Sequence, residues 1–105
     1  MSKYLITGSC SADGVKGLMQ EGGSKRRDAA AAVESVGGSM DVMYYSFGDA
    51  DVIAVCDIPD PVSAAAVSML INSSGAVGVT LTPLLTVEEI DAAAGKTPSY
   101  RPPGS

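Results

Sequence analysis

Apolar residues recur along the chain in two spacings, and the order of these segments predicts how the protein folds. Runs rich in β-branched and aromatic residues favour strands, whereas apolar residues three to four positions apart favour helices. The predicted strands cover residues 3–10, 39–47, 50–58 and 76–85, and the predicted helices cover residues 15–22, 24–36, 61–72 and 86–94. This βαββαβ order, with a short additional C-terminal helix, predicts an α+β, ferredoxin-like fold: a four-stranded antiparallel sheet with both long helices on one face.

Capping residues support the starts of the last two predicted helices. Asp60 can accept a hydrogen bond from a backbone N–H in the first helical turn, and Pro61 suits the first helical position. Thr86 and Glu89 have the spacing of a capping box, in which each side chain accepts a hydrogen bond from the other residue's backbone N–H.

Glycines mark the other boundaries. Because glycine costs about 1 kcal/mol inside a helix, Gly22-Gly23 is expected to divide the first helical segment, with Ser24 capping its second part. Gly37-Gly38 ends that part. Between two predicted strands, Gly48-Asp49 predicts the turn of a β-hairpin.

The predicted strands are apolar on both sides. In residues 50–58, Val52, Ala54 and Cys56 point to one face of the sheet, while Ile53 and Val55 point to the other. An antiparallel sheet with one face in water alternates apolar and polar residues, and this strand does not. Since helices cover one face, we expect a second copy of the chain to cover the other, which makes the protein a homodimer or a higher homo-oligomer.

The composition is that of one folded domain. The chain has 105 residues, of which 46% are hydrophobic and 18% charged, which favours folding over disorder. We expect the domain to span residues 1–95, followed by a flexible, proline-rich tail at residues 96–105. No apolar stretch approaches the roughly 18 residues of a membrane-spanning helix, and the N-terminal residues do not resemble a signal peptide. The expected location is therefore the cytoplasm, without a membrane partner.

Charge and residue types narrow the function classes. The net charge is −5, and residues 28–95 contain neither lysine nor arginine, which disfavours binding to nucleic acid. The chain has no histidine, and its two cysteines, Cys10 and Cys56, are far apart in sequence. We therefore expect no metal site, no cofactor and two reduced thiols.

Three basic residues are candidates for binding a small ligand. Lys25 and Arg27 follow a glycine pair near the start of a predicted helix, where backbone N–H groups favour an anion. The alternative is a solvated or ion-paired surface. Lys16, on the opening turn of the first predicted helix, either reaches a cavity between sheet and helices or lies in water.

The predicted hairpin contributes the remaining candidates. Asp49 and Asp51 flank its turn, where two carboxylates can perform acid–base chemistry or hold a cation. Aspartate is equally suited to the turn itself. Tyr45 either lines a ligand cavity, where its phenol orients a small molecule, or fills an interface between subunits.

Five segments together resemble the GYD domain family of small bacterial and archaeal proteins. They are Tyr4-Leu5-Ile6, Gly14-Val15-Lys16-Gly17-Leu18, Gly22-Gly23-Ser24-Lys25-Arg26-Arg27, Tyr45-Ser46-Phe47-Gly48-Asp49-Ala50-Asp51-Val52 and Leu84-Leu85-Thr86. The resemblance covers about residues 1–94. Gly48 and Asp51 match the Gly-Tyr-Asp pattern that names the family, whereas Ala50 occupies the tyrosine position. A role for that hydroxyl is therefore not implied for this chain.

The resemblance implies a fold and an assembly, and it leaves two functions open. The family resembles the dimeric α/β barrel group, whose members pair their sheets face to face. The first function is a non-catalytic cytosolic module that oligomerises and binds a small anionic or apolar metabolite between sheet and helices. The second is a cofactor-independent enzyme acting on a small aromatic or polyketide-like substrate. In that enzyme Lys16, Arg27, Tyr45 or Asp51 would supply the polar catalytic groups, and only fold analogy supports it.

Overall fold

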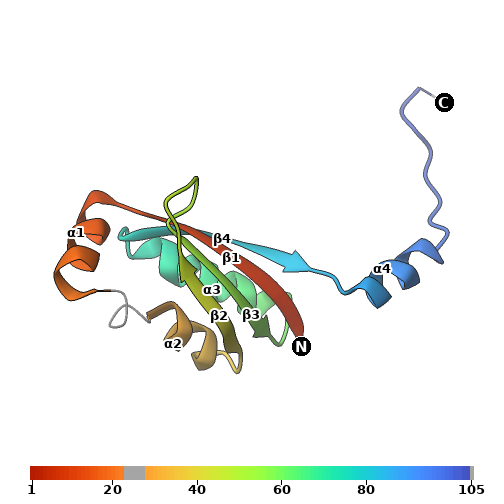
Figure 1. Cartoon of the computed structure of the whole chain (residues 1–105). Coiled ribbons are helices and arrows are strands. Elements are labelled where there is room, and N and C mark those ends of the chain that lie inside the picture. Colours follow the sequence, from red (N-terminus) through yellow and green to blue (C-terminus); the bar gives the residue numbers. More distant parts are fainter. Residues whose placement is uncertain (23–27, 105) are drawn as a thin grey trace.

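The fold is a four-stranded antiparallel sheet with helices on one face, as predicted (Figure 1). The computed structural model describes residues 1–22 and 28–104. Its elements are β1 (Ser2–Cys10), α1 (Ala12–Glu21), α2 (Asp28–Ser35), β2 (Ser39–Tyr45), β3 (Val52–Ile58), α3 (Pro61–Ser73), β4 (Val77–Leu84) and α4 (Val87–Ala94). The strands lie in the order β2-β3-β1-β4, so β1 is paired on both sides and β2 and β4 are edge strands. This is the ferredoxin-like arrangement of an α+β domain.

The first helix begins earlier than the apolar pattern predicts. α1 starts at Ala12 instead of Val15, because the Ser11 side chain accepts a hydrogen bond from the Gly14 backbone N–H at 3.2 Å and caps the helix. The helix ends before Gly22, whose φ of +75° only glycine adopts readily. The predicted cap Ser24 lies outside the described residues.

The turn of the hairpin is longer than predicted. β2 ends at Tyr45 and β3 begins at Val52, so residues 46–51 form a loop in place of a turn limited to Gly48-Asp49. Its base is closed by the Ser46 backbone N–H, which donates to the Asp51 carbonyl at 2.9 Å. The Asp51 backbone N–H donates to Gly8 of β1 at 2.8 Å, which holds the loop against β1 and shortens the ladder between β2 and β3.

The predicted caps of the last two helices are confirmed. Asp60 accepts a hydrogen bond from the Ser63 backbone N–H at 2.7 Å, with Pro61 in the first turn of α3. The backbone N–H of Thr86 donates to Glu89 Oε1 at 2.9 Å, and the Glu89 N–H donates to Thr86 Oγ1 at 3.0 Å. These bonds satisfy N–H groups that have no partner within the helix.

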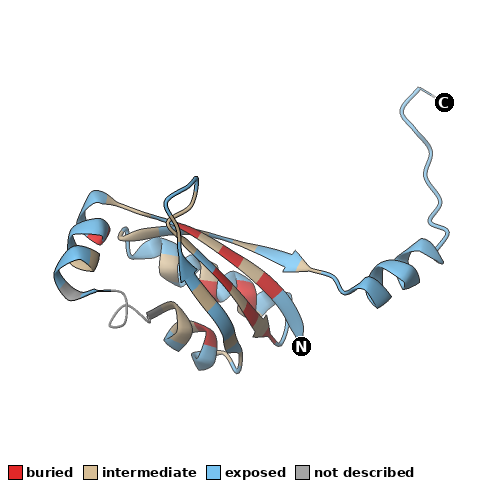
Figure 2. Ribbon diagram, in the orientation of Figure 1, coloured by how far each residue is buried: buried red, intermediate tan, exposed pale blue. Residues whose placement is uncertain are grey.

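The core lies between the sheet and helices α2 and α3 (Figure 2). Its fully buried side chains are Ile6 of β1, Cys56 and Ile58 of β3, Val33 of α2 and Val67 of α3. Alternate residues of β1 and β3 point toward the helices, as the period of two in a strand requires. Among the described residues, no polar or charged side chain is buried.

The other side of the sheet, here called the outer face, carries no helix and is apolar in its middle. Its apolar residues are Leu5, Val42, Tyr44, Ile53 and Val55, which oppose one another in the strand registers. Tyr44 is 66% exposed, Val42 43% and Ile53 37%. The two-sided apolar pattern that the sequence shows is therefore present as an exposed patch in the single chain.

A charged cluster borders this patch. The Lys3 ammonium lies 2.6 Å from an Asp41 carboxylate oxygen and 3.0 Å from an Asp57 oxygen. These two hydrogen bonds, that to Asp41 first, raise the pKa of Lys3 above its ordinary value. The cluster places charged groups at one end of the apolar patch, and Thr7, Thr80 and Thr82 adjoin the patch on β1 and β4.

The chain leaves this body after β4. The C-terminal arm, defined as residues 85–94, contains α4, which projects beyond the end of the sheet (Figure 1). No residue of α4 is buried, and the arm is exposed throughout in Figure 2. Residues 96–104 form neither helix nor strand. Within the described residues, no helix is long and apolar enough to cross a membrane.

Substitution of Gly14 tests the close contact between α1 and the start of β4. A Cβ atom at this position would lie 2.5 Å from the Ala76 carbonyl oxygen, which already accepts a hydrogen bond from the Ser11 N–H. Gly14→Ala should therefore lower the free energy of unfolding by about 1–3 kcal/mol, measured by chemical denaturation. Gly48→Ala is the matched control, because no atom lies within 4 Å of its added Cβ. Equal stabilities of the two variants would contradict the contact.

Candidate ligand-binding cavity

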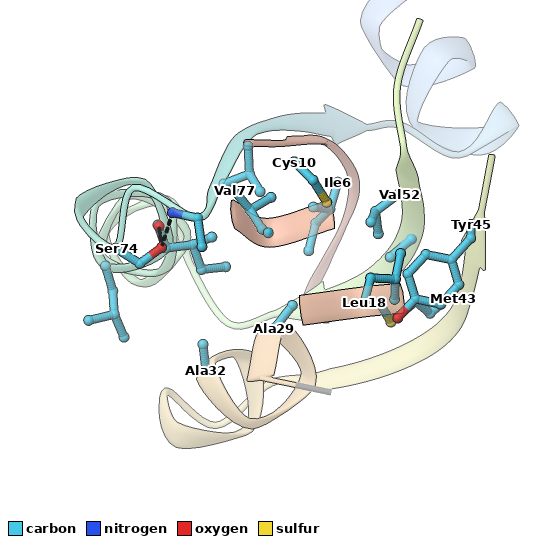
Figure 3. Close-up of a pocket in the computed structure, with 16 residues that line it drawn as sticks. Ile6, Cys10, Leu18, Ala29, Ala32, Met43, Tyr45, Val52, Ser74 and Val77 are labelled. Carbon is cyan, nitrogen blue, oxygen red and sulfur yellow. Dashed lines mark hydrogen bonds between the residues drawn. The ribbon is translucent and has the colours of Figure 1, made fainter. Parts of the chain in front are cut away.

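A cavity of about 340 Å³ lies between the sheet and helices α1, α2 and α3 (Figure 3). The sheet contributes Ile6, Cys10, Met43, Tyr45, Val52, Ala54, Val77 and Val79. The helices and their flanking residues contribute Gly14, Leu18, Ala29, Ala32, Leu70, Ile71, Ser74 and Ala76. Its volume is within the range of small-molecule sites.

Small side chains leave this space open. Ala29 and Ala32 of α2 point toward the cavity (Figure 3). Ala54 of β3 is a further small residue of the lining. Leu18 of α1, with Met43 and Tyr45 of β2, lies together at one side. Helices with alanine at these positions cover the sheet without filling the volume above it.

Three side chains give the described lining its polar groups, namely Tyr45, Cys10 and Ser74. The Ser74 hydroxyl donates to the Ile71 carbonyl at 2.7 Å and accepts from the Ala76 backbone N–H at 3.3 Å, so both of these bonds are local. Tyr45 is 40% exposed and lies at the end of β2. No carboxylate, ammonium or guanidinium group lies in this lining as far as the structure describes it.

Of the predicted site residues that the structure describes, Tyr45 alone lines the cavity. Lys16 lies exposed on α1, and Asp49 lies exposed in the hairpin loop; neither contributes to the lining. Lys25 and Arg27 lie outside the described residues. The described candidates are thus not gathered into one constellation.

Asp51 connects the hairpin to β1. Its carboxylate oxygen Oδ2 accepts a hydrogen bond from the Cys10 backbone N–H at 2.8 Å, in addition to the backbone bonds that join it to Gly8 and Ser46. The Ser46 hydroxyl donates to the Ala50 carbonyl next to it. These bonds are a structural reason for aspartate at this position.

The two cysteines differ in environment, and neither of them forms a disulfide. Cys56 is fully buried, and its thiol lies 3.8 Å from the Tyr4 carbonyl oxygen. Burial, with a smaller contribution from the charges of Asp41 and Asp57, raises the pKa of Cys56 to about 11. Since the thiolate is the reactive form, Cys56 is inert near neutral pH. Cys10 is only half-buried and lines the cavity.

Most of the cavity residues were not singled out from the sequence, because they are apolar and resemble ordinary core residues. Leu18, Ala29 and Val77 are examples. The available signal is the alanine-rich sequence of α2, from which Ala29 and Ala32 line the cavity. For metals, the described residues contain no group of three or more His, Cys, Asp or Glu side chains placed to hold an ion.

The chain belongs to the GYD domain family, whose profile matches residues 4–94. This assignment agrees with the five sequence segments and with the ferredoxin-like sheet. Comparison with curated proteins and with solved structures gave no significant match.

Replacement of Asp51 tests its bond to β1. Asp51→Ala leaves the half-buried Cys10 N–H without this acceptor and should lower the free energy of unfolding by about 1–3 kcal/mol. Asp51→Asn keeps an acceptor oxygen and should recover part of the loss. The exposed Asp49→Ala, measured in the same denaturation experiment, should stay within about 0.5 kcal/mol of the wild type. A loss at Asp49 equal to that at Asp51 would show that the hydrogen bond is not the cause.

Proposed function

We propose that this GYD domain is a self-associating, non-catalytic module that binds a small apolar molecule between its sheet and its helices. The cavity is the observation that carries the proposal. It is open enough to admit a ligand, and it lies on the helix side, where the strand and helix residues are otherwise tightly packed. Binding there would leave the outer face available for a second subunit.

The lining supports an uncharged ligand. A charged group buried without a partner is costly, and the described lining holds no side chain of opposite charge for an anion or a cation. The apolar majority of the lining favours an aliphatic or aromatic body. Tyr45, Cys10 and Ser74 are the side chains of the described lining that present polar atoms to such a molecule.

The outer face supports self-association. Its exposed apolar residues form a patch, with Lys3, Asp41 and Asp57 as a polar border. An interface typically has this anatomy, with an apolar centre and a solvated polar rim. Two outer faces packed together would bury Leu5, Ile53 and Val55, in the middle of the patch, in both subunits.

A cytoplasmic protein without nucleic-acid or membrane partners fits these properties. Two cysteines that form no disulfide are suited to a reducing compartment. The net charge of −5 repels phosphodiester backbones. The second hypothesis is a cofactor-independent enzyme that uses Lys16, Arg27, Tyr45 or Asp51. It is less well supported, because Tyr45 lines the cavity whereas Lys16 and Asp51 do not, and Arg27 lies outside the described residues.

Fluorescence of a neutral apolar probe, N-phenyl-1-naphthylamine, tests the cavity. The probe should bind saturably to the wild type, and Ala32→Leu should weaken binding by about tenfold or more, because the larger side chain occupies the cavity. Ala65→Leu is the matched control, since Ala65 is exposed on α3 and does not line the cavity. No saturable binding, or equal weakening by both substitutions, would refute ligand binding in the cavity.

Sedimentation equilibrium tests self-association through the outer face. The wild type should have at least about twice the chain mass of 10.6 kDa, and Tyr44→Asp should return the protein to the mass of a single chain, because it places a charge in the apolar patch. Val62→Asp, on the exposed side of α3, is the control and should leave the mass unchanged. A wild type of 10.6 kDa in dilute solution would refute the proposal.

A further inference from the structure

We infer that the C-terminal arm of one protomer packs on the outer face of a second copy, against the patch beside edge strand β2. The inference rests on the proposed self-association and adds to it a second contact, made by α4. The arm and the patch are both apolar surfaces that the single chain leaves exposed.

The arm is an amphipathic helix without a surface to pack on. Leu85 is 60% exposed, Val87 75% and Ile90 52%. Val87, Ile90 and Ala94 follow one another at three- and four-residue spacing and form one stripe along α4, whereas Glu88 and Glu89 fall outside it. α4 spans only Val87–Ala94, and a helix this short is marginal in water unless an apolar face is packed. Its capping box fixes where it starts but does not bury the stripe.

The protomer's own patch is out of reach of its arm in this structure. β4 ends at Leu84, opposite Lys3 of β1, and the arm continues beyond that end of the sheet (Figure 1). The most exposed apolar residues of the outer face, Tyr44 and Val42, lie on β2, the opposite edge strand. With β3 and β1 in between, the two edges are separated by about 14 Å. The arm of a second copy is not held at the β4 edge of this sheet, so it can approach β2 directly.

Burial of apolar surface, and not charge, favours the same pairing. The arm itself carries Glu88, Glu89 and Asp91, and the nearest cation, Lys96, follows it after Gly95. In a twofold dimer each subunit provides one arm and one patch, so both contacts form twice.

Sedimentation of arm variants tests the inference. Ile90→Asp places a charge in the apolar stripe and should weaken self-association by about tenfold or more. Ala92→Asp places the same charge on the other side of α4 and is the matched control, expected to stay within about twofold of the wild type. Because no residue of α4 is buried in the single chain, both variants should keep the unfolding temperature of the isolated protomer.

The outcomes separate the arm from the outer face. A wild type at the mass of one chain overturns both the self-association and the arm contact. A wild-type dimer that Tyr44→Asp dissociates and Ile90→Asp leaves unchanged overturns the arm contact and keeps the interface between outer faces. Equal weakening by Ile90→Asp and Ala92→Asp also overturns the arm contact, because the stripe would then have no special role.

Disulfide trapping establishes which chain the arm touches. A mixture of Tyr44→Cys and Ile90→Cys proteins should form, on mild oxidation, a cross-linked species with one chain of each kind. A mixture of Tyr44→Cys and Ala92→Cys proteins controls for the native thiols and should form less. Absence of excess cross-linking in the first mixture overturns the inference. Cross-linking within single chains of the Tyr44→Cys/Ile90→Cys double variant at high dilution overturns it as well.

Discussion

The short side chains of the helix layer decide what lies above the sheet. α2 contains the run Ala29–Ala32, and its Ala29 and Ala32 offer little volume to the space above the strands, whereas α3 contributes the larger Leu70 and Ile71. At the end of the sheet where Tyr4 lies opposite Cys56, the space is filled, with Val33 of α2 in the same cluster. Toward the other end, where Cys10 lies opposite Val77, it remains open as the cavity. A close-packed core and a cavity thus lie under the same helix layer. Longer side chains in that layer would extend the core, but they would fill the cavity.

Features that depend on neighbouring residues could be read from the sequence. Asp60, Thr86 and Glu89 cap their helices through bonds to backbone groups three residues away, and their roles follow from spacing alone. The hairpin could not be read in this way. Its loop is determined by bonds from Asp51 to Gly8 and Cys10 of β1, more than forty positions earlier in the chain, and no local pattern contains that information.

The candidate site was harder to predict than the fold for a chemical reason. In a sequence, charged and polar residues are the ones whose chemistry indicates a function. Lys16, Asp49 and Asp51 are of this kind, but the fold places them in solvent or in a structural bond. The cavity is lined mainly by apolar residues, which in a sequence are indistinguishable from core. Tyr45 was found because it is amphipathic and lies at the end of a strand, where it can reach both cavity and solvent. The outer face was predictable because strand alternation assigns each residue to a side before any packing is known.

The central position of β1 has a consequence for how the chain folds during synthesis. β1 is the first element to be made, yet its partners are β3, which begins at Val52, and β4, which ends at Leu84. The two ladders that enclose β1 therefore join residues distant in sequence, and loop closure on this scale slows folding. The hairpin of β2 and β3 and the short helices can form locally, but the sheet cannot be completed until nearly the whole domain has been made. Until then, the backbone N–H and C=O groups on both sides of β1 are unpaired. The nascent chain is therefore exposed to aggregation until its C-terminal half has been synthesised.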